Sequence, residues 1–185
     1  MTPRELEEYR TLRDTIRQRG TARIWVFLAG LAAWAALTVA TAALAAVPVA
    51  TLLPLLVLAA AFEAVFSLHV GVERIGRYVQ VFFEDDSPGE AEPGEIRKWE
   101  HVAMRFGRPL AGANIDPLFA MFFILATVLN FVPVLTAEPI RIEVIVFGAA
   151  HLLLIGRILA AKWAASRQRA ADLERFQQLK QQTKS

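Results

Sequence analysis

The stretch "IWVFLAGLAAWAALTVATAALAAV", residues 24–47, decides the fold of this chain. It runs for 24 residues without a charged side chain. As a helix rising ~1.5 Å per residue it reaches roughly 36 Å, enough to cross a hydrocarbon core of ~30 Å. Because lipid offers no hydrogen-bond partners, a single segment crosses it as a helix, which satisfies its own backbone. The stretch therefore predicts a transmembrane helix.

Three more apolar runs follow, at 52–72, 117–135 and 140–156. The 185 residues are 55% hydrophobic with a mean hydropathy of +0.39, well above a typical soluble domain. We therefore expect an all-α membrane protein built as a four-transmembrane-helix bundle. The expected organisation is a cytoplasmic amphipathic helix at 1–23, a transmembrane domain at 24–162 that includes a cytoplasmic loop at 73–116, and a cytoplasmic helical tail at 163–185.

The basic residues lie almost entirely on one side of this bundle. Of the 20 Lys and Arg residues, 19 fall in the two terminal segments or between the second and third runs, and only Arg141 falls elsewhere. The positive-inside rule then places both termini and the 73–116 loop in the cytoplasm. The Arg- and Ala-rich composition favours a bacterial inner (plasma) membrane. The first run is too long for the core of a cleavable signal peptide.

The charged flanks carry helix signals of their own. Thr2 and Glu5 have the spacing of a capping box, and Gly20 is a natural helix stop. The residues between them repeat apolar side chains at helical spacing, as do residues 95–109 within the loop. We expect amphipathic cytoplasmic helices at the N-terminus, in this loop and in the tail, where the last helix continues into the cytoplasm.

Two ionisable residues stand near the middle of apolar runs. Glu63 lies 11 residues after Leu52, and His151 lies 11 residues after Ile140, so each falls roughly 16 Å deep, near the middle of the membrane. A charge there is unfavourable and usually faces a partner inside the bundle. The levels predict that Glu63 and His151 meet. The pair is either a site that handles protons or cations, or a neutral hydrogen bond that joins two helices.

A second group of ionisable residues marks the inner end of the same helices. His69 and Arg157 each lie 17 residues past the outer ends of their runs. We interpret the group as a charge network at the inner boundary that fixes the helix ends, rather than as a binding site. Its members are His69, Glu73, Arg74, Arg77 and Arg157.

Other chemistry finds little support in the sequence. There is no cysteine, which excludes disulfides and thiolate metal sites. His69 with Glu73 and His101 lacks a metal-binding motif, and His69 and His151 differ too much in level to hold a haem. No catalytic constellation can be assembled, so we expect no enzyme, no cofactor and no metal. Nothing in the basic segments indicates nucleic acid as a partner.

The first apolar run also bears on assembly. Its small residues Ala29 and Ala33, Ala32 and Ala36, and Gly30 allow close approach of another helix, within the subunit or between subunits. Two functions remain open. The chain is expected to be an oligomeric channel- or transporter-like protein that handles protons or cations at Glu63 and His151. Alternatively, it is a non-catalytic scaffold or accessory subunit that docks a protein partner through its cytoplasmic helices.

Overall fold

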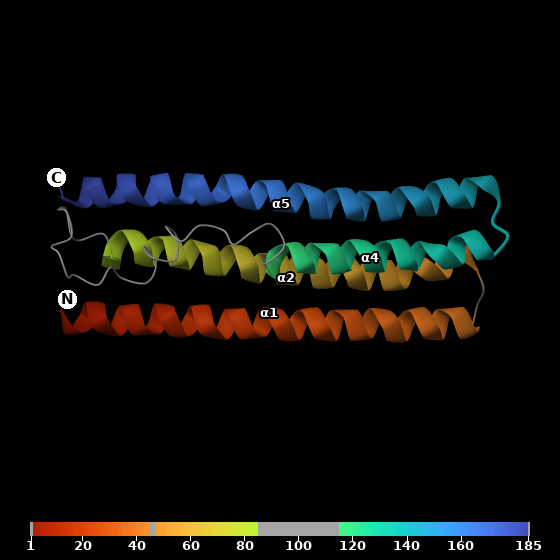
Figure 1. Cartoon of the computed structure of the whole chain (residues 1–185), viewed down its shortest axis with the longest axis horizontal. Coiled ribbons are helices and arrows are strands. Elements are labelled where there is room, and N and C mark those ends of the chain that lie inside the picture. Colours follow the sequence, from red (N-terminus) through yellow and green to blue (C-terminus); the bar gives the residue numbers. More distant parts are fainter. Residues whose placement is uncertain (1, 45–46, 85–114, 185) are drawn as a thin grey trace. The chain divides into compact units, whose positions relative to one another are not determined.

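The computed structural model describes residues 2–44, 47–84 and 115–184. These residues are 96% helical and contain no strand, and four of their helices are long and apolar enough to cross a membrane. The prediction of an all-α chain with four long apolar helices is therefore confirmed. The expected amphipathic helix at 95–109 lies outside the described residues. Figure 1 labels the principal helices, and the described elements are α1 (Pro3–Leu44), a 3-10 helix (Pro48–Thr51), α2 (Leu52–Val79), a π-helical turn (Gln80–Glu84), α4 (Ile115–Thr136) and α5 (Arg141–Lys184).

The N-terminal capping box forms as the sequence predicts. The Thr2 N–H donates to Glu5 Oε2 at 2.6 Å, and the Glu5 N–H donates to Thr2 Oγ1 at 3.3 Å. The expected stop at Gly20, however, is wrong, because α1 continues through it to Leu44. A glycine inside a helix costs only about 1 kcal/mol, which does not outweigh an unbroken hydrogen-bond ladder. The N-terminal amphipathic segment and the first apolar run thus form one helix.

The described chain divides into two compact units. We name the first the apolar unit; it comprises residues 22–67 and 115–163. We name the second the charged unit; it comprises residues 2–21, 68–84 and 164–184. Helices α1, α2 and α5 each contribute residues to both units, so each unit gathers segments that are far apart in the sequence.

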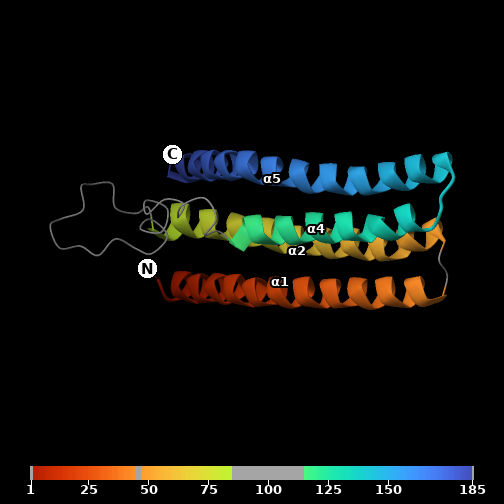
Figure 2. The same cartoon turned by 45° about the vertical axis from the view of Figure 1, so that its right-hand side comes forward.

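The core of the apolar unit is built from aromatic and aliphatic side chains of all four long helices. Phe27 of α1 packs edge-on against Phe119 of α4 with ring centroids 4.6 Å apart. Phe62 of α2 packs edge-on against Phe123 of α4 at 5.5 Å, and α2 and α4 lie side by side in Figures 1 and 2. Edge-to-face pairs of this kind add to the burial of apolar area.

Large apolar side chains also cover the outer surface of the apolar unit. Leu152 is 69% exposed, Leu153 is 75% exposed and Trp25 is 68% exposed. A soluble monomer rarely presents a continuous apolar surface of this kind to water, whereas lipid accommodates it without penalty. The four candidate spans and this surface both indicate a membrane protein.

The charged unit has its own packing, centred on the end of α2. Tyr78 donates a hydrogen bond to Glu8 of α1 at 3.0 Å and packs edge-on against Phe176 of α5 at 5.7 Å. Phe83, in the π-helical turn, packs against Tyr9 of α1 at 5.7 Å. These contacts hold the N-terminal part of α1 and the C-terminal part of α5 on the same stretch of α2.

Candidate functional site

Glu63 of α2 forms a two-pronged ion pair with Arg157 of α5. Arg157 Nε lies 2.8 Å from Glu63 Oε1, and Arg157 Nη2 donates to Glu63 Oε2 at 2.8 Å. The guanidinium also lies over the rings of Phe66 and Phe62, 5.4 Å and 5.9 Å from their centroids. The two charged side chains remain 48% and 43% exposed. Arg157 thus neutralises Glu63 on the surface of the apolar unit rather than inside its core.

His151 lies apart from this pair in a buried hydrogen-bond network. Its side chain is 4% exposed; Nδ1 lies 2.7 Å from the Phe147 carbonyl oxygen, and Nε2 lies 3.0 Å from Asn130 Nδ2. Asn130 Oδ1 accepts the Trp34 indole N–H at 3.2 Å, which identifies the other end of the amide as the donor. His151 is therefore the neutral tautomer protonated on Nδ1, donating to Phe147 and accepting from Asn130.

The expected pair of Glu63 with His151 does not form. Glu63 meets a residue 94 positions along the chain, whereas His151 lies 88 positions along, so the two helices are offset by six residues, or ~9 Å, from the expected register. The reason lies at the start of α2. Thr51 is buried, and its carbonyl accepts a hydrogen bond from Asn130 Nδ2 at 2.9 Å. The beginning of α2 is thereby shifted toward His151 and away from Ile140, so Glu63 lies beyond His151.

A close contact between α1 and α2 shows where Glu63 lies relative to the residues of α1. Gly30 of α1 abuts Ala61 of α2 so closely that a Cβ on Gly30 would overlap the Ala61 Cβ. Glu63 lies two residues past Ala61, and Arg23 lies seven residues before Gly30 on the antiparallel helix. Glu63 is therefore about five residues, or ~8 Å, from the level of Arg23.

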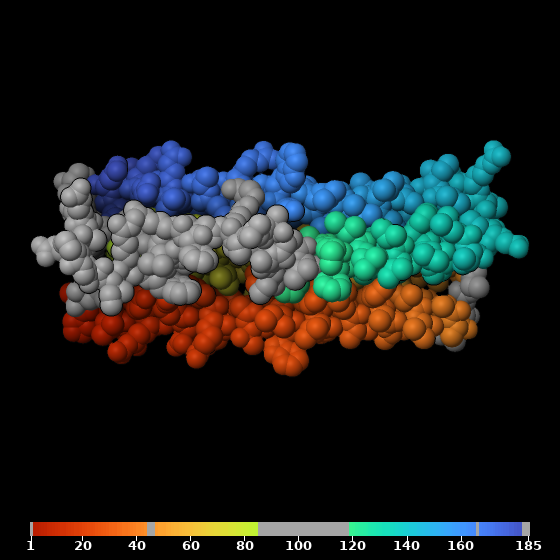
Figure 3. Space-filling view, viewed as in Figure 1, coloured from red at the N-terminus to blue at the C-terminus, as the bar shows by residue number. Residues whose placement is uncertain are grey.

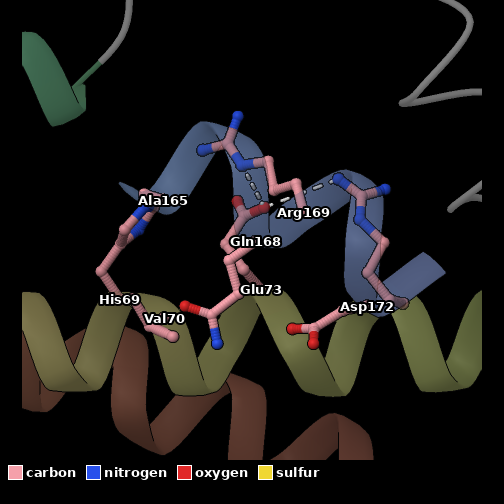
Figure 4. A pocket seen from close by; sticks show the side chains of 8 residues that line it. His69, Val70, Glu73, Ala165, Gln168, Arg169 and Asp172 are labelled. Atoms are coloured by element: carbon pink, nitrogen blue, oxygen red, sulfur yellow. Dashed lines mark ion pairs between the residues drawn. The ribbon is translucent and has the colours of Figure 1, made fainter. Parts of the chain in front are cut away.

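The remaining charged candidates gather in the charged unit without Arg157. Glu73 accepts Arg169 at 2.8 Å and lies 3.5 Å from Arg77, while Arg74 pairs with Asp172 at 3.2 Å. Figure 4 shows the ion pairs of Glu73 beside His69. These side chains line a cavity of about 10 Å³. That volume is about enough for one water molecule. The expected network is therefore present in part, with Arg169 and Asp172 in place of Arg157.

Trp34, Thr51 and Asn130 are polar groups that sequence reasoning overlooked. Asn130 is the only amide side chain between Pro117 and Ala137, and it is 1% exposed. A lone amide in an otherwise apolar run is a signal of an interhelical hydrogen bond. The same signal does not reveal that its partner is a backbone carbonyl before α2.

The described residues hold no group of three or more His, Asp or Glu side chains that could bind a metal ion. Within the apolar unit, Glu63 and Arg157 are instead occupied by each other, and His151 is occupied by amide and backbone groups. No family model, no curated protein and no solved structure matches this chain.

Proposed function

We propose that this chain is a non-catalytic scaffold or accessory subunit of a membrane complex, embedded through the apolar unit and docking a protein partner through the charged unit. The observation that carries the proposal is the pairing of Glu63 with Arg157. A guanidinium supplies its donors in a fixed fork, so Arg157 engages both carboxylate oxygens of Glu63 at once. A cation that binds Glu63 would have to displace Arg157 from both oxygens.

The occupation of His151 supports the same proposal. Both of its ring nitrogens are used by Asn130 and the Phe147 carbonyl, within a buried network that contains no carboxylate. A proton relay needs a partner that gives and takes protons in turn, and an amide does neither. The network suits a helix-joining role, which is what a scaffold requires of it.

The charged unit supports the docking half of the proposal. Ion pairs and aromatic contacts brace its helical segments against one another, as at Tyr78, Glu8 and Phe176. A braced helical surface presents side chains in fixed positions, which reduces the entropy lost on binding a partner. The chain is further proposed to self-associate through α1, because Ala29, Ala33 and Ala36 are exposed and allow close helix approach.

An ion-flux assay tests the proposal against conduction. Purified protein in liposomes, given a pH gradient and a panel of cations, is expected to leak no faster than protein-free liposomes. Glu63→Gln should leave this result unchanged, as should the control Glu138→Gln, which removes an exposed carboxylate outside the pair. The scaffold proposal would be overturned if the unmodified protein conducts ions, Glu63→Gln abolishes that flux and Glu138→Gln preserves it. Ion handling at Glu63 would then be the better proposal.

The proposed topology places both termini on the cytoplasmic side of a bacterial inner membrane. The 19 basic residues on that side support this orientation. The chain has no cysteine, so single cysteines can report position without background. An impermeant thiol reagent added outside intact cells should label a cysteine at Thr136 and leave cysteines at Arg10 and Gln181 unmodified. All three positions are exposed in the structure. Outside labelling at Arg10 or Gln181 would reverse the orientation.

A further inference from the structure

A groove of about 440 Å³ runs along the surface of the apolar unit between α4 and α5. Figure 3 shows the face on which these two helices lie beside each other. The groove is apolar along its length and has one charged residue, Lys162, at one end. Its lining includes Ala120, Ile124, Val128, Ile158, Leu159 and Lys162.

Two exposed tryptophans place the charged end of the groove at the membrane interface. Trp163, the neighbour of Lys162, is 71% exposed, and Trp25 of α1, two residues from Arg23, is 68% exposed. Exposed tryptophans next to basic residues are typical of the level of the lipid headgroups. Lys162 therefore lies where phosphate groups are found, and the rest of the groove extends from there into the hydrocarbon.

We propose that the groove binds one phospholipid of the inner leaflet, with an acyl chain along α4 and α5 and an anionic headgroup at Lys162. From Ala120 to Val128 the groove follows eight residues of α4, or ~12 Å, close to the ~15 Å reach of one leaflet. The cytoplasmic leaflet is the one that carries anionic lipids. The proposal depends on the topology given above but not on whether the chain is a scaffold.

The charge at the end of the groove favours a lipid over a second transmembrane helix. Lys162 is exposed, and an apolar helix laid along the groove would cover its charged side chain with hydrocarbon, which is unfavourable. A phospholipid instead offers an apolar chain to Ile124 and Leu159 and a negative group to Lys162. Its chemistry changes from apolar to anionic along its length in the same order as the groove.

Native mass spectrometry tests the proposal with defined lipids. The purified chain in detergent, given equal amounts of phosphatidylglycerol and phosphatidylcholine, is expected to retain phosphatidylglycerol preferentially. Lys162→Gln should reduce that preference about five-fold, the factor that corresponds to ~1 kcal/mol for one basic residue at an anionic surface. Leu159→Trp, which fills the groove, should reduce the retention of both lipids.

Two matched controls make the outcome specific to the groove. Arg167→Gln removes an exposed cation five residues further along α5, and Leu152→Trp adds the same bulk at a lipid-facing position of α5 outside the groove. Neither should change retention. The proposal is overturned if Lys162→Gln has no effect or if Arg167→Gln has an equal one. It is also overturned if Leu159→Trp abolishes dimers while leaving lipid retention intact, because the groove would then hold a second copy.

Discussion

Replacing Gly30 with alanine is expected to lower the free energy of unfolding by about 1–3 kcal/mol, the range of an overpacked core. The new Cβ would overlap the Cβ of Ala61 and lie 3.7 Å from its Cα, so α1 and α2 could keep their pairing only by moving apart. Alanine is the better helix former, so helix propensity alone would raise the free energy of unfolding. A measured loss would therefore come from the close contact. Thermal unfolding of the detergent-solubilised protein, followed by tryptophan fluorescence, measures the effect.

Two companion variants separate overpacking from other causes. Ala61→Gly in the Gly30→Ala background removes the overlapping methyl group and should recover much of the loss. Gly156→Ala adds a methyl group to α5 where nothing lies within 4 Å, so it should leave stability unchanged or raise it by ~0.5–1 kcal/mol. If the double variant unfolds at no higher a temperature than Gly30→Ala alone, the close contact of α1 with α2 at Ala61 would be disproved.

The existence of the four long helices could be predicted from sequence because lipid leaves a predominantly apolar run of 17 or more residues little alternative. Helix ends were less predictable. Gly20 has the character of a stop, but its intrinsic preference is weak, and the N-terminal part of α1 is bonded to the end of α2 through Glu8 and Tyr78. Local propensity yields to contacts of this kind.

The register between α2 and α5 could not be read from the apolar runs. Counting from Leu52 assumes that α2 and α5 begin at one level, but the 3-10 helix before α2 packs against α4, and the Thr51 carbonyl bonds to Asn130. This contact joins residues 79 positions apart, which no local pattern specifies. Because of the resulting six-residue offset, Glu63 pairs with Arg157, and His151 bonds to the side-chain amide of Asn130.

Asn130→Leu is expected to lower the free energy of unfolding by about 2–4 kcal/mol. Asn130 accepts from the Trp34 indole and donates toward the Thr51 carbonyl and His151. Interhelical hydrogen bonds in membranes contribute ~0.6 kcal/mol on average and up to ~1.7 kcal/mol, and the stranded partners add a desolvation penalty. Leucine has a similar size, so the loss would come from the polar contacts rather than from a cavity. Thermal and denaturant unfolding in detergent would measure it.

Thr127→Val is the matched control, since Thr127 is fully buried on the same helix but bonds only to the Phe123 carbonyl one turn away. Its loss should stay below about 1 kcal/mol, because no second helix is involved. Trp34→Phe removes one of the three partners, so its effect and that of Asn130→Leu should be less than additive in the double variant. Strict additivity would mean that Trp34 and Asn130 contribute independently to stability. The hydrogen bond between them would then not be what stabilises the contact of α1 with α4.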